Sequence, residues 1–214
     1  MIEVHLMDII WHGHSCFELV SGGYSAVIDP FQDTSVGTAY PHVRLTADAV
    51  YISHEDRDHN FREGVTLCNT GKANPFAVTE LETYHDIMRG RLRGMNTVRI
   101  FAAEGMRVAH LGDLGCIPDH NVLGALQNVD VMLLPVGGHY TIDGETAAEI
   151  VRLTRPRTVI PMHYKVPGLT VDVAGAEDFL KRMEGVEMID GYELEINPMT
   201  PKVACFAKCM SSAN

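Results

Sequence analysis

The stretch ISHEDRDHN, residues 52–60, places two histidines, three acidic residues and an arginine within nine positions. It continues directly from the apolar run ADAVYI, residues 47–52, which is typical of a buried strand. A run of charges is usually a solvated surface, whereas histidine and carboxylate side chains gathered at a strand end are typical ligands of a divalent metal ion. The two interpretations make different predictions, because only a metal site requires similar residues at the ends of other strands.

Candidate ligands do recur at the carboxyl ends of predicted strands. Segment 48–53 precedes His54 and Asp56, 75–84 precedes His85, 106–112 precedes Asp113, and 158–162 precedes His163. Strand ends are rigid supports for polar groups that must converge, and crevices beside them are common ligand sites. A solvated run of charges does not predict this recurrence, so the pattern indicates a metal site.

The spacing within the loop favours two ions. His54, Asp56 and Asp58 alternate, so an extended backbone would direct them to one side, and His59 breaks the alternation. One set of ligands can therefore face one ion while the last two face another. Two ions about 3.5–4 Å apart can share a carboxylate and a hydroxide, and such a hydroxide is a strong nucleophile at neutral pH.

The composition argues against several classes of protein. The 214 residues are interpreted as a single domain over 1–214. The formal charge of −11, from 17 Lys and Arg against 28 Asp and Glu, argues against binding of a nucleic-acid backbone. No apolar run reaches the roughly 20 residues that cross a bilayer, and the N-terminus lacks a signal-peptide pattern. Five scattered cysteines are interpreted as reduced thiols, so we expect a cytoplasmic protein without membrane contacts.

The order of predicted elements favours sheets covered by helices. The first half reads as short strands separated by turns, whereas the second half alternates strands with helices. The predicted helices span 119–129, 144–156 and 173–184, and the closing strands span 186–190 and 192–196. Residues 201–214 are expected to pack as an edge segment. Strand-rich blocks with interspersed helices are typical of an α/β or α+β domain.

Several motifs occur together in one order along the chain. SHEDRDHN, YHDIMRGRLRGMNT, HLGDLG, LLPVGGHYTID and PMHY follow WHGHSCF and VIDPF. Together they make the chain similar to the metallo-β-lactamase superfamily of hydrolases, in particular to a small bacterial branch that includes the lactonase acting on L-ascorbate 6-phosphate. The resemblance runs from about residue 9 to residue 165. It implies a four-layer αββα sandwich, in which two β-sheets carry helices on both outer faces.

The resemblance also implies a set of ligands. The metal loop of the family reads His-x-His-x-Asp-His, which His54, Asp58 and His59 match, whereas Asp56 stands in the place of a histidine. The implied ligands are His54, Asp56 and His85 at a first ion, Asp58, His59 and His163 at a second, and Asp113 as a bridge. The two divalent ions would be Zn, or Mn or Fe because Asp56 supplies an oxygen donor. The alternatives are a first site that is weak or empty, or no metal at all.

Further residues receive two interpretations each. His14 matches a family position near the site and would contact the substrate or a ligand. Asp29 would orient a ligand or cap a turn. His139 and Tyr140 lie in a glycine-flanked turn that either forms the rim of the pocket or only precedes a helix cap. Lys165 would hold an anionic group or lie on the surface.

These features predict a metal-dependent hydrolase, and the resemblance implies that it acts on a small ester, lactone or phosphoester. A metal-bridging hydroxide would attack, Asp113 would position it, and Asp58 would accept a proton. The expected partner is a small-molecule substrate with an anionic group, and the branch makes a homo-oligomer plausible. Two alternatives remain. One is a metal-dependent nuclease or phosphodiesterase, which the acidic charge disfavours; the other is a non-catalytic metal- or ligand-binding member of the fold.

Overall fold

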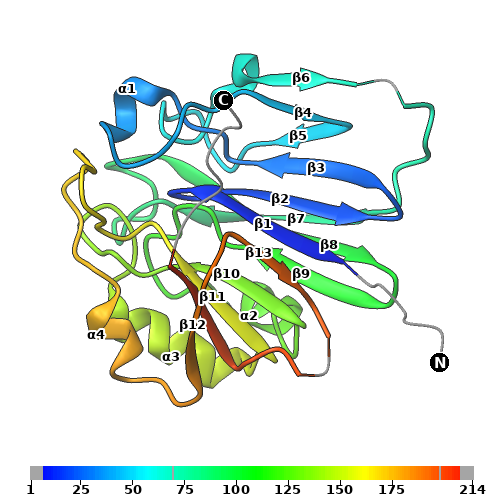
Figure 1. Cartoon of the computed structure of the whole chain (residues 1–214). Coiled ribbons are helices and arrows are strands. Elements are labelled where there is room, and N and C mark those ends of the chain that lie inside the picture. Colours follow the sequence, from blue (N-terminus) through cyan, green and yellow to red (C-terminus); the bar gives the residue numbers. More distant parts are fainter. Residues whose placement is uncertain (1–6, 69, 198, 208–214) are drawn as a thin grey trace.

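Two β-sheets pack face to face, and their facing sides form the main core of the molecule (Figure 1). The computed structural model describes residues 7–68, 70–197 and 199–207. The first sheet has the order β13 (Glu193–Glu195), β1 (Asp8–Gly13), β2 (Cys16–Ser21), β3 (Tyr24–Ile28) and β5 (Ala49–Tyr51). β1, β2 and β3 form an antiparallel meander, and β5 joins β3 in parallel.

The second sheet has the order β12 (Val186–Ile189), β14 (Val203–Phe206), β11 (Thr158–Met162), β10 (Val131–Pro135), β9 (Met106–His110), β8 (Met95–Ala103) and β7 (Ala77–Tyr84). Its β7, β8 and β9 are antiparallel, whereas β9, β10, β11, β14 and β12 run parallel. Every residue of β10 and β11 is buried, because parallel strands in the middle of a sheet are covered on both faces.

Helices cover the outer face of the second sheet. α2 (His120–Ala125), α3 (Gly144–Thr154) and α4 (Glu177–Leu180) lie together at the bottom of Figure 1. The side chain of Asp143 accepts a hydrogen bond from the amide of Thr146 and caps α3. The helices predicted over 119–129 and 173–184 are shorter than expected. The second contracts to the single turn of α4, with Val173 and Ala176 buried in the segment before it.

The outer face of the first sheet has a thinner cover. It consists of α1 (Asp33–Val36), the 3₁₀ turn Arg62–Gly64, and a parallel pair of strands, β4 (Leu45–Ala47) and β6 (Val65–Leu67), which the sequence analysis did not predict. A second core cluster, which includes Phe31 and Val65, lies beneath this cover. The predicted α/β sandwich class is confirmed, with the helices concentrated on one side.

The two closing strands predicted after residue 184 are present, whereas residues 203–206 differ from the prediction. The two closing strands enter different sheets, since β12 lies in the second sheet and β13 in the first. Residues 203–206 do not form an edge segment. They form β14, a buried strand between β11 and β12, because the apolar sequence VACF is suited to the interior of a sheet. Residues 208–214 of the predicted edge segment lie outside the described residues.

Two further observations concern the described ranges. No helix in them is long and apolar enough to cross a membrane. Cys16, Cys68, Cys116 and Cys205 are free thiols, and Cys209 lies outside the described residues.

Candidate metal centre

The residues predicted as ligands come together where strands of both sheets end. His14 follows β1, the 54–59 loop follows β5, His85 follows β7, Asp113 follows β9, and His163 follows β11. They form three overlapping groups, and within each group the potential ligand atoms lie within 4.8 Å of one another: His54, Asp56 and His85; His14, Asp58, His59 and His163; and His54, His59 and Asp113. All seven predicted ligands therefore share one cluster, and His14 joins them.

Asp113 lies at the centre of this cluster. Its Oδ1 is 3.1 Å from Nε2 of His59, and its Oδ2 is 3.2 Å from Nε2 of both His85 and His163. Nε2 of His54 lies 3.9 Å from the same Oδ2. The carboxylate of Asp113 thus faces histidines of the group that contains Asp56 and of the group that contains Asp58.

The two groups that do not contain Asp113 differ in exposure. We call His54, Asp56 and His85 the first ligand group, and in it the side chain of Asp56 is 62% exposed, with Oδ2 3.4 Å from Nε2 of His54. We call His14, Asp58, His59 and His163 the second ligand group. In the second group Asp58 is 21% exposed, and the three histidines are almost completely buried.

The loop does not reach this arrangement by the predicted alternation. Residues 53–59 form bends and a turn, in which the amides of His59 and Asn60 donate to the carbonyl oxygen of Asp56. The expectation that an extended backbone would direct His54, Asp56 and Asp58 to one side is therefore wrong. The turn sends Asp56 and Asp58 to different ligand groups because it reverses the chain between them.

Asp29 and Ser53 orient two of the histidines. Nδ1 of His59 lies 2.9 Å from Oδ2 of Asp29, and the same oxygen accepts a 2.6 Å hydrogen bond from Ser53 Oγ. Since the Ser53 hydroxyl donates to Asp29, Nδ1 of His54, 2.9 Å from that hydroxyl, must donate to it. In the neutral form of both imidazoles the proton is then on Nδ1, which leaves the lone pair of Nε2 facing the cluster.

Asn96 and Gly112 position Asp113, and sequence reasoning did not single them out. The amide of Asp113 donates to Oδ1 of Asn96 at 2.9 Å, and the Asn96 amide group donates to Leu111 O and Thr83 Oγ1. A Cβ on Gly112 would lie 2.3 Å from Oδ1 of Asn96, so this contact requires glycine. Asn96 lies in the motif YHDIMRGRLRGMNT and Gly112 in HLGDLG, and a polar residue and a glycine within these motifs were the signals that could have identified them.

The backbone is strained at several residues of the site. His14, Asp29 and His163 have φ values of 52°, 50° and 52°, in the left-handed region that non-glycine residues rarely adopt. Such conformations cost about 1–3 kcal/mol each and persist where the surrounding structure determines them, most often at functional sites. The strain is consistent with side chains that are held in place for the centre.

Many polar atoms of the cluster are buried and make no hydrogen bond in the described part of the chain, although several lie 3.1–3.9 Å from the Asp113 carboxylate. They are Nε2 of His54 and His59, both ring nitrogens of His85 and His163, Nδ1 of His14, and Oδ1 of Asp113. Leaving a buried polar group unpaired costs about 1–3 kcal/mol. Nitrogen and carboxylate oxygen atoms with converging lone pairs are the donors that Zn²⁺ and similar divalent ions bind. The residues therefore fit a metal centre.

The charges of the cluster also favour a cation. Burial alone would favour a neutral carboxyl, but His163 and His59 hold the pKa of Asp113 well below its ordinary value. Burial likewise opposes a charge on His59, yet Asp113, Asp58 and Asp29 raise its pKa well above the usual range. Burial and the nearby His163 lower the pKa of His14 to about 4. The carboxylates thus attract positive charge, and His14 is a neutral imidazole at neutral pH.

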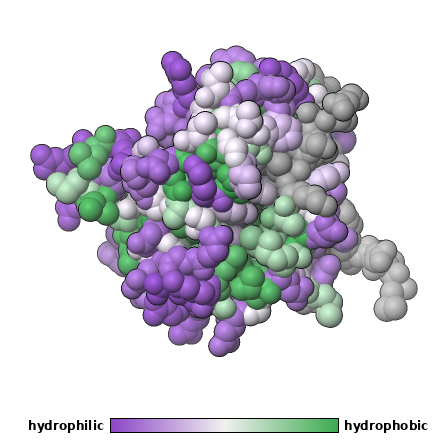
Figure 2. Space-filling view, turned by 60° about the vertical axis from the view of Figure 1, so that its left-hand side comes forward, coloured by the Kyte–Doolittle hydropathy of each residue, from purple (hydrophilic) through white to green (hydrophobic). Residues whose placement is uncertain are grey.

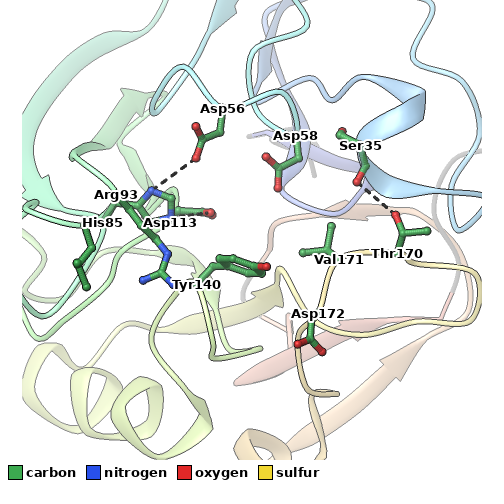
Figure 3. A pocket seen from close by; sticks show the side chains of 11 residues that line it. Ser35, Asp56, Asp58, His85, Arg93, Asp113, Tyr140, Thr170, Val171 and Asp172 are labelled. Carbon is green, nitrogen blue, oxygen red and sulfur yellow. Dashed lines mark hydrogen bonds and ion pairs between the residues drawn. The ribbon is translucent and has the colours of Figure 1, made fainter.

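A cavity of about 650 Å³ opens above the cluster (Figure 3). Asp56, Asp58, His85 and Asp113 line it, so the metal centre is accessible. Tyr140, predicted for the rim, also lines it. On the face shown in Figure 2, hydrophilic side chains surround smaller hydrophobic groups.

Two other predicted site residues have partners away from the cavity floor. His139 is half exposed, and its Nδ1 lies 3.6 Å from Oδ2 of Asp172, which lines the cavity. Nζ of Lys165 donates to the carbonyl oxygens of Leu169 and Val171 at 2.7 and 3.0 Å. Lys165 therefore holds the 165–171 loop, and it is not among the residues that line the cavity.

A two-sheet sandwich with a cluster of His and Asp at its strand ends is characteristic of the metallo-β-lactamase class. The family model described as "Beta-lactamase superfamily domain" matches residues 8–163, and the chain belongs to this family. Its relatives include a UPF0173 metal-dependent hydrolase of Thermoplasma acidophilum, 32% identical over 74% of this chain and 83% of that protein. This protein is accordingly a metal-dependent hydrolase of the metallo-β-lactamase superfamily.

Solved structures agree with this assignment. A proposed zinc-dependent hydrolase of the superfamily from Thermotoga maritima is 31% identical, with a TM-score of 0.71 over 94% of this chain and 98% of that one. A metallo hydrolase from Ignicoccus hospitalis, Igni18, is 25% identical, with a TM-score of 0.59 over 78% of this chain and 87% of that one.

Proposed function

We propose that this hydrolase binds two divalent ions and cleaves a small ester, lactone or phosphoester. The observation that carries the proposal is the position of Asp113. Its two oxygens lie 3.1 and 3.2 Å from histidines of the second and first ligand groups, His59 and His85. A carboxylate between two sets of partnerless nitrogens is suited to hold two ions side by side.

The chain's own residues have separate tasks in this proposal. The first ligand group would hold one ion, the second group the other, and Asp113 both. When bound, such ions acidify water into a hydroxide nucleophile and polarise the bond under attack. Asp58 lines the cavity and would accept the proton that the reaction releases. Its neighbours His59 and His14 lower its pKa despite burial, so the side chain is ionised at neutral pH, as a proton acceptor must be.

The donor types allow more than one metal. The second ligand group is dominated by imidazole nitrogens, which suit Zn²⁺. The first group offers two imidazoles and the carboxylate of Asp56, and added oxygen donors favour Mn or Fe relative to Zn. We therefore propose zinc in the second group, with zinc, manganese or iron in the first.

Elemental analysis of protein purified without chelator or affinity metal tests the metal content. About two ions per chain are expected. The protein should also hydrolyse members of a panel of lactones, carboxylic esters and phosphomonoesters, and this activity should disappear on chelation and return when metal is added. A bis(4-nitrophenyl) phosphate assay run in parallel tests the phosphodiesterase alternative. Metal binding without hydrolysis of any panel member would contradict the proposed substrate class and favour a binding protein.

A further inference from the structure

An arginine-rich loop borders the cavity. Residues 86–94, DIMRGRLRG, carry Arg89, Arg91 and Arg93 in a chain whose formal charge is −11. Of the three arginines, Arg93 lines the cavity together with His85 and Tyr140. Figure 3 shows these three side chains on one side of the opening, below Asp56.

The guanidinium of Arg93 rests on an aromatic ring. Its Cζ lies 5.2 Å from the centroid of the Tyr140 ring, within the range of a cation–π contact. No carboxylate forms an ion pair with Arg93 in the described ranges, in contrast to Arg99, which pairs with Glu80. Stacking leaves the N–H groups along the edge of the guanidinium available, and their fork matches a carboxylate or phosphate.

The backbone of Arg93 is held in place by the residue that follows ligand His85. The carboxylate of Asp86 accepts four backbone hydrogen bonds of 2.7–3.1 Å, from the amides of Met88, Gly90, Leu92 and Arg93. The loop is thereby fixed to the metal centre before any substrate arrives. A pre-positioned binding group loses less conformational entropy when a ligand binds.

The charges of the cavity are compatible with an anion near Arg93. Three carboxylates, Asp56, Asp58 and Asp113, lie on its floor, and two divalent ions would more than neutralise them. The carboxylate of Asp172 also lines the cavity, and its own neighbour is His139. In Figure 3 Arg93 and Asp172 lie apart, with Tyr140 between them.

We infer that Arg93 binds a negatively charged group of the substrate that does not react. The substrate class is then an ester, lactone or phosphoester that carries a separate carboxylate or phosphate. The inference rests on the proposed function, to which it adds substrate specificity. The anion would occupy the Arg93 side of the cavity while the bond to be cleaved faces the ligand cluster.

The first test compares two 4-nitrophenyl esters of similar length on the metal-loaded protein, the neutral pentanoate and the anionic hemisuccinate. We expect the native protein to have the higher kcat/KM for the hemisuccinate. Arg93→Met should reduce the ratio of the two kcat/KM values about tenfold or more, mainly through KM, because a hydrogen bond to a charged group is lost. Arg93→Lys should recover part of the ratio.

Arg91→Met is the matched control. It removes the same charge from the same loop, and Arg91 is not among the cavity-lining residues. We expect it to keep the native ratio. Equal loss of the ratio in Arg91→Met and Arg93→Met would show a general effect of surface charge and overturn the inference, as would an unchanged ratio in Arg93→Met.

The second test does not depend on catalysis. Benzenesulfonate is titrated into the metal-loaded protein, with methyl phenyl sulfone as a neutral counterpart, because a sulfonate is a weak metal ligand. Benzenesulfonate should bind the native protein and Arg91→Met equally, and Arg93→Met at least several-fold more weakly. Equal binding by all three proteins would overturn the inference. If neither ester is hydrolysed, the proposed hydrolysis of small esters fails, and this titration still decides the role of Arg93.

Discussion

The two ligand groups of the metal centre differ in how firmly they are held. In the second group His14, His59 and His163 are buried, and Asp29 fixes His59 from behind. In the first group the carboxylate of Asp56 is 62% exposed, and its nearest partner in the centre is Nε2 of His54 at 3.4 Å. A pre-oriented buried set should hold its ion more tightly than a set that includes a solvated carboxylate.

The two groups are nevertheless connected. Asp29 accepts from both His59 and Ser53, and Ser53 in turn accepts from His54, so one buried carboxylate supports a histidine in each group. Although burial opposes ionisation, His59 keeps the pKa of Asp29 at about 2, and the residue is a carboxylate at neutral pH. Substitutions in one group, in the carboxylate shared by both, or in the residues that connect them should therefore differ in their effects on metal content and metal affinity.

Removing the shared carboxylate should have the largest effect. Asp113→Ala should lose both ions and nearly all activity. The loss of activity should exceed the roughly 10–100-fold loss expected when a residue that only hydrogen-bonds a ligand is removed. Elemental analysis and kcat/KM measure both effects, with Glu187→Ala on the exposed face of β12 as a control of equal charge change. Retention of one tightly bound ion in a folded Asp113→Ala protein would mean that one ligand group is complete without it.

Asp56→Ala should affect the first group alone. We expect loss of about one ion per chain and retention of the ion in the second group, because a single ligand is removed from the exposed set. Metal content before and after dialysis against a weak chelator measures this. Glu55→Ala, which removes the neighbouring exposed acid, should bind as the native protein does. Unchanged stoichiometry in Asp56→Ala would exclude Asp56 as a ligand.

Asp29→Asn should weaken the second group without removing a ligand. The amide keeps the shape of the side chain but holds the His59 imidazole less firmly, so metal affinity or activity should fall by roughly 10–100-fold. A competition titration against a chelating dye measures the affinity. If the affinity for the ion in the first group fell more than the affinity for the ion in the second, Asp29 would not mainly support the second group, and the proposal would be contradicted.

Ser53→Ala should have the smallest effect of the four. It removes the hydroxyl that joins Asp29 to His54, and a hydrogen bond of this kind contributes about 0.5–1.5 kcal/mol, or a few-fold to about tenfold in affinity. The loss should fall mainly on the first group. Calorimetric titration of the metal-free protein with Mn²⁺ or Zn²⁺ measures this loss of affinity. A larger loss than in Asp29→Asn would contradict the expectation that Ser53→Ala has the smallest effect.

The pattern of the sequence identified the ligand set because of where the residues stand. His54, His85, Asp113 and His163 each follow an apolar run, and runs of this kind form strands whose ends meet in one place. The order of the motifs also predicted the sandwich. Errors arose where the surroundings decided the structure. Residues 203–206 form an interior strand because they pair with β11, which lies far away in the sequence. Residues 173–184 form only one turn of helix.

By itself, then, the sequence identified the residues that gather at the strand ends, since this depends on local periodicity and on which residues follow it. The order of its motifs implied the sandwich class through the resemblance to the superfamily. The resemblance also implied how the ligands divide into two groups. Only the tertiary structure showed the contacts that produce this division. The turn at Asp56 sends two acids to different groups, Asp29 sets the protonated nitrogen of His59, and Arg93 reaches the cavity through the loop that Asp86 closes. These arrangements depend on contacts between segments far apart in the chain or on turn geometry, and periodicity carries no information about either.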